Sequence, residues 1–106
     1  MGYKVQITDF ARRELEEIVK YISDILGNSR AAAGLLGDFN KQMGYLKDSP
    51  YMFSLCPLPG LQQKGYHRFI FKNNYVALYL IDDSPKKKVV TIMHVFYAKR
   101  DYQQLI

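Results

Sequence analysis

The second half of the chain contains three stretches rich in β-branched and aromatic residues, with turn residues between them. These stretches are residues 65–71, 75–81 and 89–97. Runs of this kind are typical of an antiparallel meander. Asn73 and Asn74 can supply the positive φ values that a tight hairpin needs, and Pro85 marks a break because proline cannot donate to a ladder. We therefore predict three consecutive antiparallel strands.

The first half of the chain predicts a short strand followed by a long helix. Residues 3–7 alternate apolar and polar side chains, which is the pattern of a half-buried strand. Thr8 can cap the helix that follows, and Gly27 can end it. The apolar residues at helical spacing between these two positions are Ala11, Leu15, Ile18, Ile22 and Ile25. One face of this helix is therefore expected to be buried.

A second helix is predicted to follow Asn28 and Ser29, which can cap its N-terminus. Its apolar face comprises Ala32, Leu35, Leu36, Phe39, Met43 and Leu46. Asp48-Ser49-Pro50 ends it, because the residue before a proline disfavours the helical conformation. The link between the two helices is so short that they must form an antiparallel hairpin. This hairpin is long enough to lie across one face of the sheet.

Residues 49–64 form a long connection that is rich in proline but also in large apolar side chains. A connection of this length is unusual in a small domain and is more often functional than accidental. We expect it to pack along the edge of the core. The order of strand, two helices and three strands predicts an α+β fold in a single domain, residues 1–106, with one curved sheet packed on the helical hairpin.

Two of the predicted meander strands are apolar on both faces. In residues 75–81 and 89–97, side chains of both parities are mostly hydrophobic. Strands of this kind are normally covered on both sides, but one helical hairpin can cover only one. Either the sheet curls and residues 49–64 close it, or an apolar groove is left for another protein chain.

The composition is that of a small intracellular domain. The 106 residues are 48% hydrophobic, contain one cysteine and include no apolar run long enough to span a bilayer. No secretory signal is visible, so we expect a cytoplasmic location and no membrane partner. The net charge of +5 falls entirely in residues 54–106. This asymmetry indicates either an anionic partner (nucleic acid or an acidic protein segment) or lysines that keep the domain soluble.

Few residues indicate a catalytic or metal site on their own. Cys56, His67 and His94 have no metal-site spacing, so neither a metal nor another cofactor is expected. His67 can be a general base or a partly exposed strand residue, and we favour the second interpretation. His94 has the same strand parity as Ile92 and Phe96, which predicts a core or edge position for its ring.

Short motifs spread along the whole chain accompany this order of elements. They are Tyr3-x-Val5-x-Ile7-Thr8-x-x-Ala11, Leu15-x-x-Ile18-x-x-Tyr21-Ile22, Leu46-x-x-Ser49-Pro50, Gly65-Tyr66-x-Arg68, Asn74-Tyr75-x-x-x-Tyr79 and Val95-x-Tyr97-x-Lys99-Arg100-Asp101. In order and spacing they resemble the RelE/ParE superfamily, the small toxins of type II toxin–antitoxin modules. The resemblance implies a compact α+β toxin held inactive by a cognate antitoxin whose C-terminal segment wraps around it. It also implies indirect binding of operator DNA through the antitoxin.

The resemblance leaves two mechanisms of growth inhibition open. Toxins of the RelE branch cut mRNA on the ribosome with lysines and arginines of the central strands and an arginine near the C-terminus. Toxins of the ParE branch poison DNA gyrase without a catalytic centre of their own. Aligned with the RelE branch, the strand-lysine positions fall on His67 and Phe69, the strand-arginine position falls on Val76, and only Arg100 matches. We therefore favour gyrase inhibition, with the mRNA endonuclease as the alternative.

Each hypothesis assigns its own site residues. Under the endonuclease alternative, the catalytic residues are His67, Arg68 and Arg100. The residues expected to bind the target or the antitoxin are Arg68, Lys72, Tyr75, Tyr97, Lys99 and Arg100. A third hypothesis is a non-toxic module that binds an antitoxin or belongs to a regulatory complex.

Overall fold

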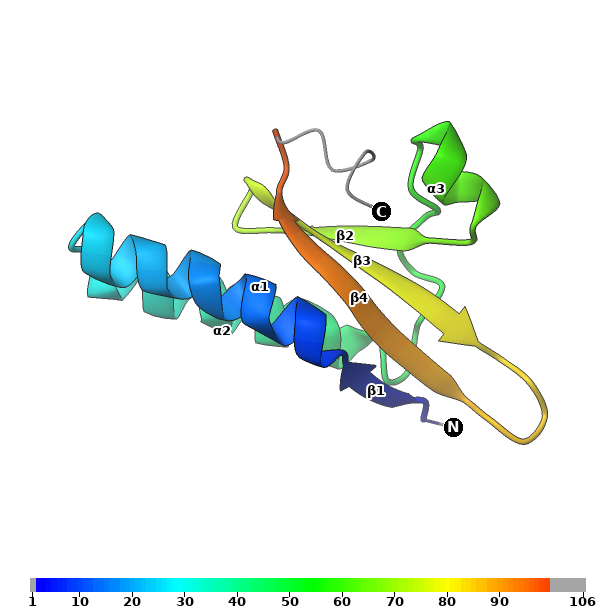
Figure 1. The fold of residues 1–106 in the computed structure, drawn as a ribbon. Helices are drawn as coiled ribbons and strands as arrows, with labels where there is room; N and C mark the ends of the chain where they lie inside the picture. The colour runs from blue at the N-terminus through cyan, green and yellow to red at the C-terminus, as the bar shows by residue number, and fades with distance from the viewer. Residues whose placement is uncertain (1, 100–106) are drawn as a thin grey trace.

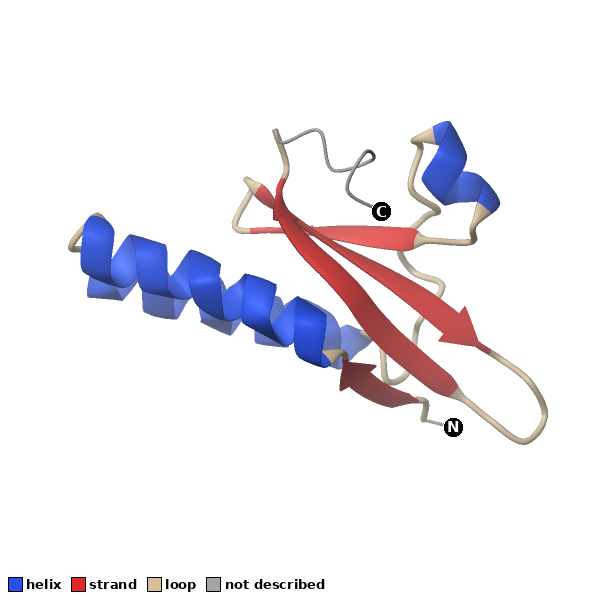
Figure 2. Cartoon of the chain, in the orientation of Figure 1, coloured by secondary structure: helices blue, strands red, loops and turns tan. Residues whose placement is uncertain are grey.

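A computed structural model describes residues 2–99 of the chain (Figure 1, Figure 2). Its elements in chain order are β1 (Lys4–Ile7), α1 (Asp9–Lys20), a π-helical segment η1 (Tyr21–Ile25), α2 (Ser29–Tyr45), α3 (Pro59–Gln63), β2 (His67–Phe71), β3 (Tyr75–Asp82) and β4 (Val89–Tyr97). An N-terminal strand, a helical hairpin and three further strands follow one another as the sequence predicts. The predicted α+β fold class is confirmed.

The four strands form one mixed sheet in the order β1-β4-β3-β2. β2, β3 and β4 are the predicted antiparallel meander. β1 joins the sheet parallel to β4, and the pairing ends where Ile7 lies beside Ile92. The two outer strands are therefore β1, which is short, and β2.

The turn between β2 and β3 lies one residue earlier than predicted. The positive φ values occur at Lys72 (51°) and Asn73 (65°), not at Asn73 and Asn74. The backbone N–H of Lys72 donates to the carboxylate of Asp38 on α2, with an N···O distance of 2.6 Å. This long-range bond fixes the turn at Lys72, although a lysine is less suited to a positive φ than an asparagine.

α1 and α2 form the predicted antiparallel hairpin and cover one face of the sheet (Figure 1). Thr8 Oγ1 accepts the N–H of Ala11 and Asn28 Oδ1 accepts the N–H of Ala31, both at 3.0 Å, so both predicted N-caps are present. α1 lies over β4 and α2 over β2. The turn that joins the helices projects beyond the sheet (Figure 1). No helix within residues 2–99 combines the length and the apolar character needed to cross a bilayer.

The end of the first helix is wound differently from the prediction. In η1 the N–H of Leu26 donates to the carbonyl of Tyr21, five residues back. Because a π turn holds more residues than an α turn, Ile25 rotates off the buried face and is 69% exposed. Leu36 is also exposed, since its neighbour Leu35 takes the core-facing position on α2. The sequence pattern predicts both residues on the buried faces, and this prediction is wrong for each.

The sheet carries a core on each face. One core lies between the helical hairpin and the sheet and includes Phe39, Phe69 and Tyr79. The other lies on the opposite face and comprises Cys56, Leu61, Tyr66, Val76, Leu78 and Phe96. Cys56 and Leu61 belong to the long connection, which therefore closes part of the second face. This agrees with the first of the two expected alternatives, in which residues 49–64 close the sheet.

The long connection is more ordered than the sequence indicates. It contains α3, and Leu55 forms an isolated antiparallel bridge with His67 on β2. The N–H of Cys56 donates to the carbonyl of Tyr66 (2.7 Å), and the N–H of Arg68 donates to the carbonyl of Ser54 (3.2 Å). These bonds extend the sheet beyond β2, so the expected packing against the edge of the core is present.

Candidate functional site

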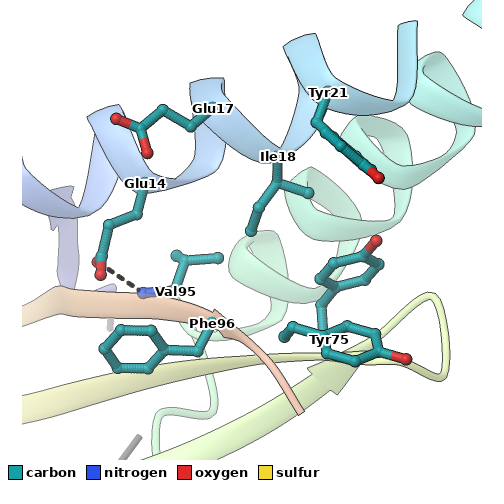
Figure 3. Close-up of a pocket in the computed structure, with 8 residues that line it drawn as sticks. Glu14, Glu17, Ile18, Tyr21, Tyr75, Val95 and Phe96 are labelled. Atoms are coloured by element: carbon teal, nitrogen blue, oxygen red, sulfur yellow. Dashed lines mark hydrogen bonds between the residues drawn. The ribbon is translucent and has the colours of Figure 1, made fainter. Parts of the chain in front are cut away.

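A groove opens where the first helix runs beside β4. The N–H of Thr8 donates to the carbonyl of Ile92 (3.1 Å), where the chain leaves the sheet to begin α1. Beyond that point α1, rather than a strand, accompanies β4. The groove between them has a volume of about 480 Å³ (Figure 3). It is lined by Glu14, Glu17, Ile18, Tyr21, Tyr75, Val95, Phe96 and Tyr97.

Three tyrosines contribute to this lining. Tyr75 and Tyr97 are partners across β3 and β4, and their ring centroids lie 5.6 Å apart at 65°. Tyr21, the first residue of η1, points from the helix toward the sheet (Figure 3). Tyr21 is 54% exposed and Tyr97 42%. Burial is the main cause that raises the pKa of Tyr75, and the nearby Tyr97 and Tyr21 raise this pKa further. The phenol of Tyr75 is therefore neutral at physiological pH.

Two carboxylates, Glu14 and Glu17, line the helix side of the groove. The side chain of Glu14 is only 17% exposed, and its Oε1 accepts the N–H of Val95 at 3.0 Å (Figure 3). β1 does not extend far enough to pair with this part of β4. Glu14 thus satisfies a backbone donor on a sheet edge that would otherwise need a strand or water.

His94 lies beside Glu14 and shares a face with only one of the two residues that the sequence groups with it. The pairing of β3 with β4 skips Met93, which forms a bulge. As a result His94 shares a face with Phe96, on which its ring stacks at 5.5 Å, and lies opposite to Ile92. Its Nδ1 is 3.7 Å from Glu14 Oε1 and makes no hydrogen bond to any group within residues 2–99.

His67 lies on the helix-facing side of β2. Its Nδ1 is 2.9 Å from the carbonyl oxygen of Phe53, and because a carbonyl only accepts, Nδ1 carries the proton and donates. The ring stacks on Tyr79 at 5.4 Å and meets Tyr51 edge-on at 5.8 Å. These contacts tie the long connection to the sheet.

Arg68 points to the opposite face of the sheet from His67. Arg68 pairs with Leu78, which belongs to the second core, whereas His67 pairs with Tyr79 of the first. The structure therefore does not bring these two predicted catalytic residues together. Arg100 lies outside the described residues.

Four residues predicted to bind a partner lie at the same end of the sheet: Lys72, Tyr75, Tyr97 and Lys99. The N–H of Ala98 donates to the carbonyl of Asn74 (2.7 Å), which holds the end of β4 beside the β2–β3 turn. Tyr75 and Tyr97 line the groove, and Arg68 does not.

A family model described as the ParE toxin of the type II toxin–antitoxin system parDE matches residues 5–102. The chain belongs to this family. This confirms the resemblance to the RelE/ParE superfamily that the motifs indicate. The chain is a toxin of a type II toxin–antitoxin system.

Solved structures are similar to this ParE-family chain in fold. One is a chain of the chromosomal ParDE system from P. aeruginosa, with a TM-score of 0.71 and 14% identity over 92% of this chain and 98% of that one. Another is a chain of the toxin–antitoxin complex RelBE2 from Mycobacterium tuberculosis, with a TM-score of 0.55 and 20% identity over 92% and 99% of the two chains. No curated protein matches the sequence.

The groove of this ParE-family chain includes residues for which the sequence predicts no binding role. Glu14 and Tyr21 lie four positions before and three positions after Ile18, so with Ile18 they form a stripe along the edge of the buried face of the first helix. A partly apolar stripe on the flank of a buried face is the signal that identifies them. Within residues 2–99, no cluster of three or more His, Cys, Asp or Glu side chains is arranged to hold a metal ion.

Proposed function

We propose that this ParE-family chain inhibits growth by binding DNA gyrase without a catalytic centre of its own, and that a cognate antitoxin neutralises it by covering the groove between α1 and β4. Through the antitoxin, the complex contacts operator DNA. The observation that carries the gyrase proposal is the separation of His67 and Arg68 onto opposite faces of the sheet.

This separation argues against a single hydrolytic site on β2. A general base and a cation for the departing phosphate must lie within hydrogen-bond reach of the same substrate atoms. Neighbouring side chains of a strand point away from each other, so His67 and Arg68 cannot both meet one phosphate. A toxin that acts by binding needs no such convergence.

The groove supports the proposal of an antitoxin partner. It is open, partly apolar and bordered by an edge of β4 that β1 leaves unpaired. Surfaces of this kind on small proteins are typical interaction sites. The two solved structures described above both come from toxin–antitoxin systems.

Short pulse-labelling after induction of the gene in a bacterium tests the target. The proposal predicts that incorporation of thymidine into DNA falls before incorporation of methionine into protein. An earlier loss of protein synthesis would contradict it and favour a ribosome-dependent endonuclease. Growth without any arrest would favour the third hypothesis, a non-toxic module that binds an antitoxin or belongs to a regulatory complex.

The endonuclease remains the second candidate because of one observation. Since Nδ1 of His67 donates to Phe53, Nε2 is the nitrogen that carries the lone pair in the neutral ring, and a general base would act through it.

The variant His67→Asn separates the two candidates. An asparagine amide can replace the Nδ1 donor toward Phe53 but has no basic nitrogen. We expect growth inhibition by His67→Asn to equal that of the wild type, measured as colony formation after induction. Loss of toxicity with an unchanged melting temperature would instead assign a base role to His67.

A further inference from the structure

We propose that the groove between α1 and β4 is a receptor for an arginine side chain carried by an apolar segment of the partner. In this arrangement Glu14 and Glu17 pair with the guanidinium group, and the tyrosines of the groove stack against it. The identity of the partner rests on the proposed antitoxin, whereas the preference for arginine is a property of this chain alone.

The charge of the groove is opposite to that of the molecule. The chain has a net charge of +5, yet the charged groups of the groove lining within residues 2–99 are Glu14 and Glu17, without a lysine or arginine. Glu14 is mostly withdrawn from water, so solvent screens its charge less than that of a surface carboxylate. An acidic niche on a basic protein is complementary to a cation.

The tyrosines favour arginine over lysine as that cation. A cation placed over an aromatic face within about 6 Å of the ring centroid is attracted by the ring. Tyr75 and Tyr97 meet edge to face, and Tyr21 points toward Tyr75 from the helix (Figure 3), so aromatic surface is available on both sides of the groove. Guanidinium is planar and stacks on such rings while its edge donates two parallel bonds to a carboxylate.

Glu14 is already held in place for this interaction. Its bond to the N–H of Val95 fixes the carboxylate, which reduces the conformational entropy that a ligand would have to remove. A carboxylate offers about four acceptor positions, and Val95 takes one of them. Nδ1 of His94 also lies 3.7 Å from Oε1 of Glu14, which leaves Oε2 of Glu14 to meet a guanidinium.

The other walls define the residues that flank the arginine. Ile18, Val95 and Phe96 are apolar and complete the lining. Val95 and Phe96 are already buried, whereas Ile18 is partly exposed, so an aliphatic side chain beside the arginine would remove Ile18 from water on binding. The chemistry of the groove specifies a segment of the form apolar–arginine–apolar.

Titration of the chain with two tripeptides tests this inference. The probes are Ac-Leu-Arg-Leu-NH2 and the same peptide with citrulline, which has the shape of arginine without its charge. Two-dimensional NMR follows the Val95 amide, which reports directly on Glu14, and the ring signals of Tyr75 and Tyr97. We expect the arginine peptide to bind at least about tenfold more tightly than the citrulline peptide, and less tightly as salt is added.

Variants of the first helix localise the effect. Glu14→Gln keeps an acceptor for the N–H of Val95 but removes the charge, and together with Glu17→Gln it should abolish the preference for arginine. Glu16→Gln removes the same charge from the same helix outside the groove lining and should leave the preference unchanged. The inference is wrong if both peptides bind equally, if neither shifts the groove signals, or if the double variant still prefers arginine.

This experiment is independent of the toxic activity. Peptide binding without growth arrest would retain the arginine site and refute the proposed function. Growth arrest without peptide binding would refute the arginine site and retain the proposed function.

Discussion

Single side chains join the long connection to the sheet. The hydroxyl of Tyr79 donates to the carbonyl of Pro50 at 2.8 Å, and Nδ1 of His67 donates to the carbonyl of Phe53 at 2.9 Å. The sequence places Tyr79 and His67 on strands, but it does not identify acceptors that lie far away along the chain. Their roles follow only from the folded arrangement, in which both side chains are structural ties.

The variant Tyr79→Phe tests the first of these ties. It removes the donor to Pro50 and leaves a buried carbonyl unsatisfied, which should lower the free energy of unfolding by about 1–2 kcal/mol at neutral pH. Urea unfolding measures the difference. A variant as stable as the wild type would show that water replaces the hydroxyl.

The same variant has a predictable pH dependence. Burial raises the pKa of Tyr79 well above its ordinary value of 10.0. The unfolded chain therefore releases this proton at a lower pH than the folded chain, and the stabilisation is complete below pH 10 and lost as the pH rises above it. Between pH 9 and 11 the wild type should lose more stability than Tyr79→Phe.

Local sequence signals account for most elements, and the departures have long-range causes. The caps at Thr8 and Asn28 and the strand patterns depend on neighbouring residues, so the sequence reveals them. The shifted turn depends on Asp38 of α2, more than thirty positions before Lys72. The bridge between Leu55 and His67 likewise joins the long connection to β2.

The variant Lys72→Gly tests the position of the β2–β3 turn. A lysine at a positive φ carries a steric cost of about 1–2 kcal/mol that glycine avoids. Glycine loses more backbone entropy than lysine on folding, which offsets part of this gain. We expect a net gain of about 0.5–1 kcal/mol in urea unfolding. Asn74→Gly, at a position without a positive φ, should be neutral or destabilising. The reverse order would place the turn where the sequence predicts it.

At the scale of the whole molecule, the fold separates stability from recognition. The sheet is covered by a core on each face, and the groove lies along the part of β4 that β1 does not reach. The excess of positive charge is visible in the sequence, but the acidic groove is not, because its residues come from α1, η1, β3 and β4. Only the fold places them together.

The most direct test of the central claim is a supercoiling assay with purified DNA gyrase, relaxed plasmid and the chain made by cell-free synthesis. The proposed function predicts that supercoiling falls in proportion to the amount of the chain added, while mRNA on purified ribosomes remains intact in a parallel reaction. Full supercoiling at an excess of the chain, with cleaved ribosome-bound mRNA, would contradict the account and establish the endonuclease instead.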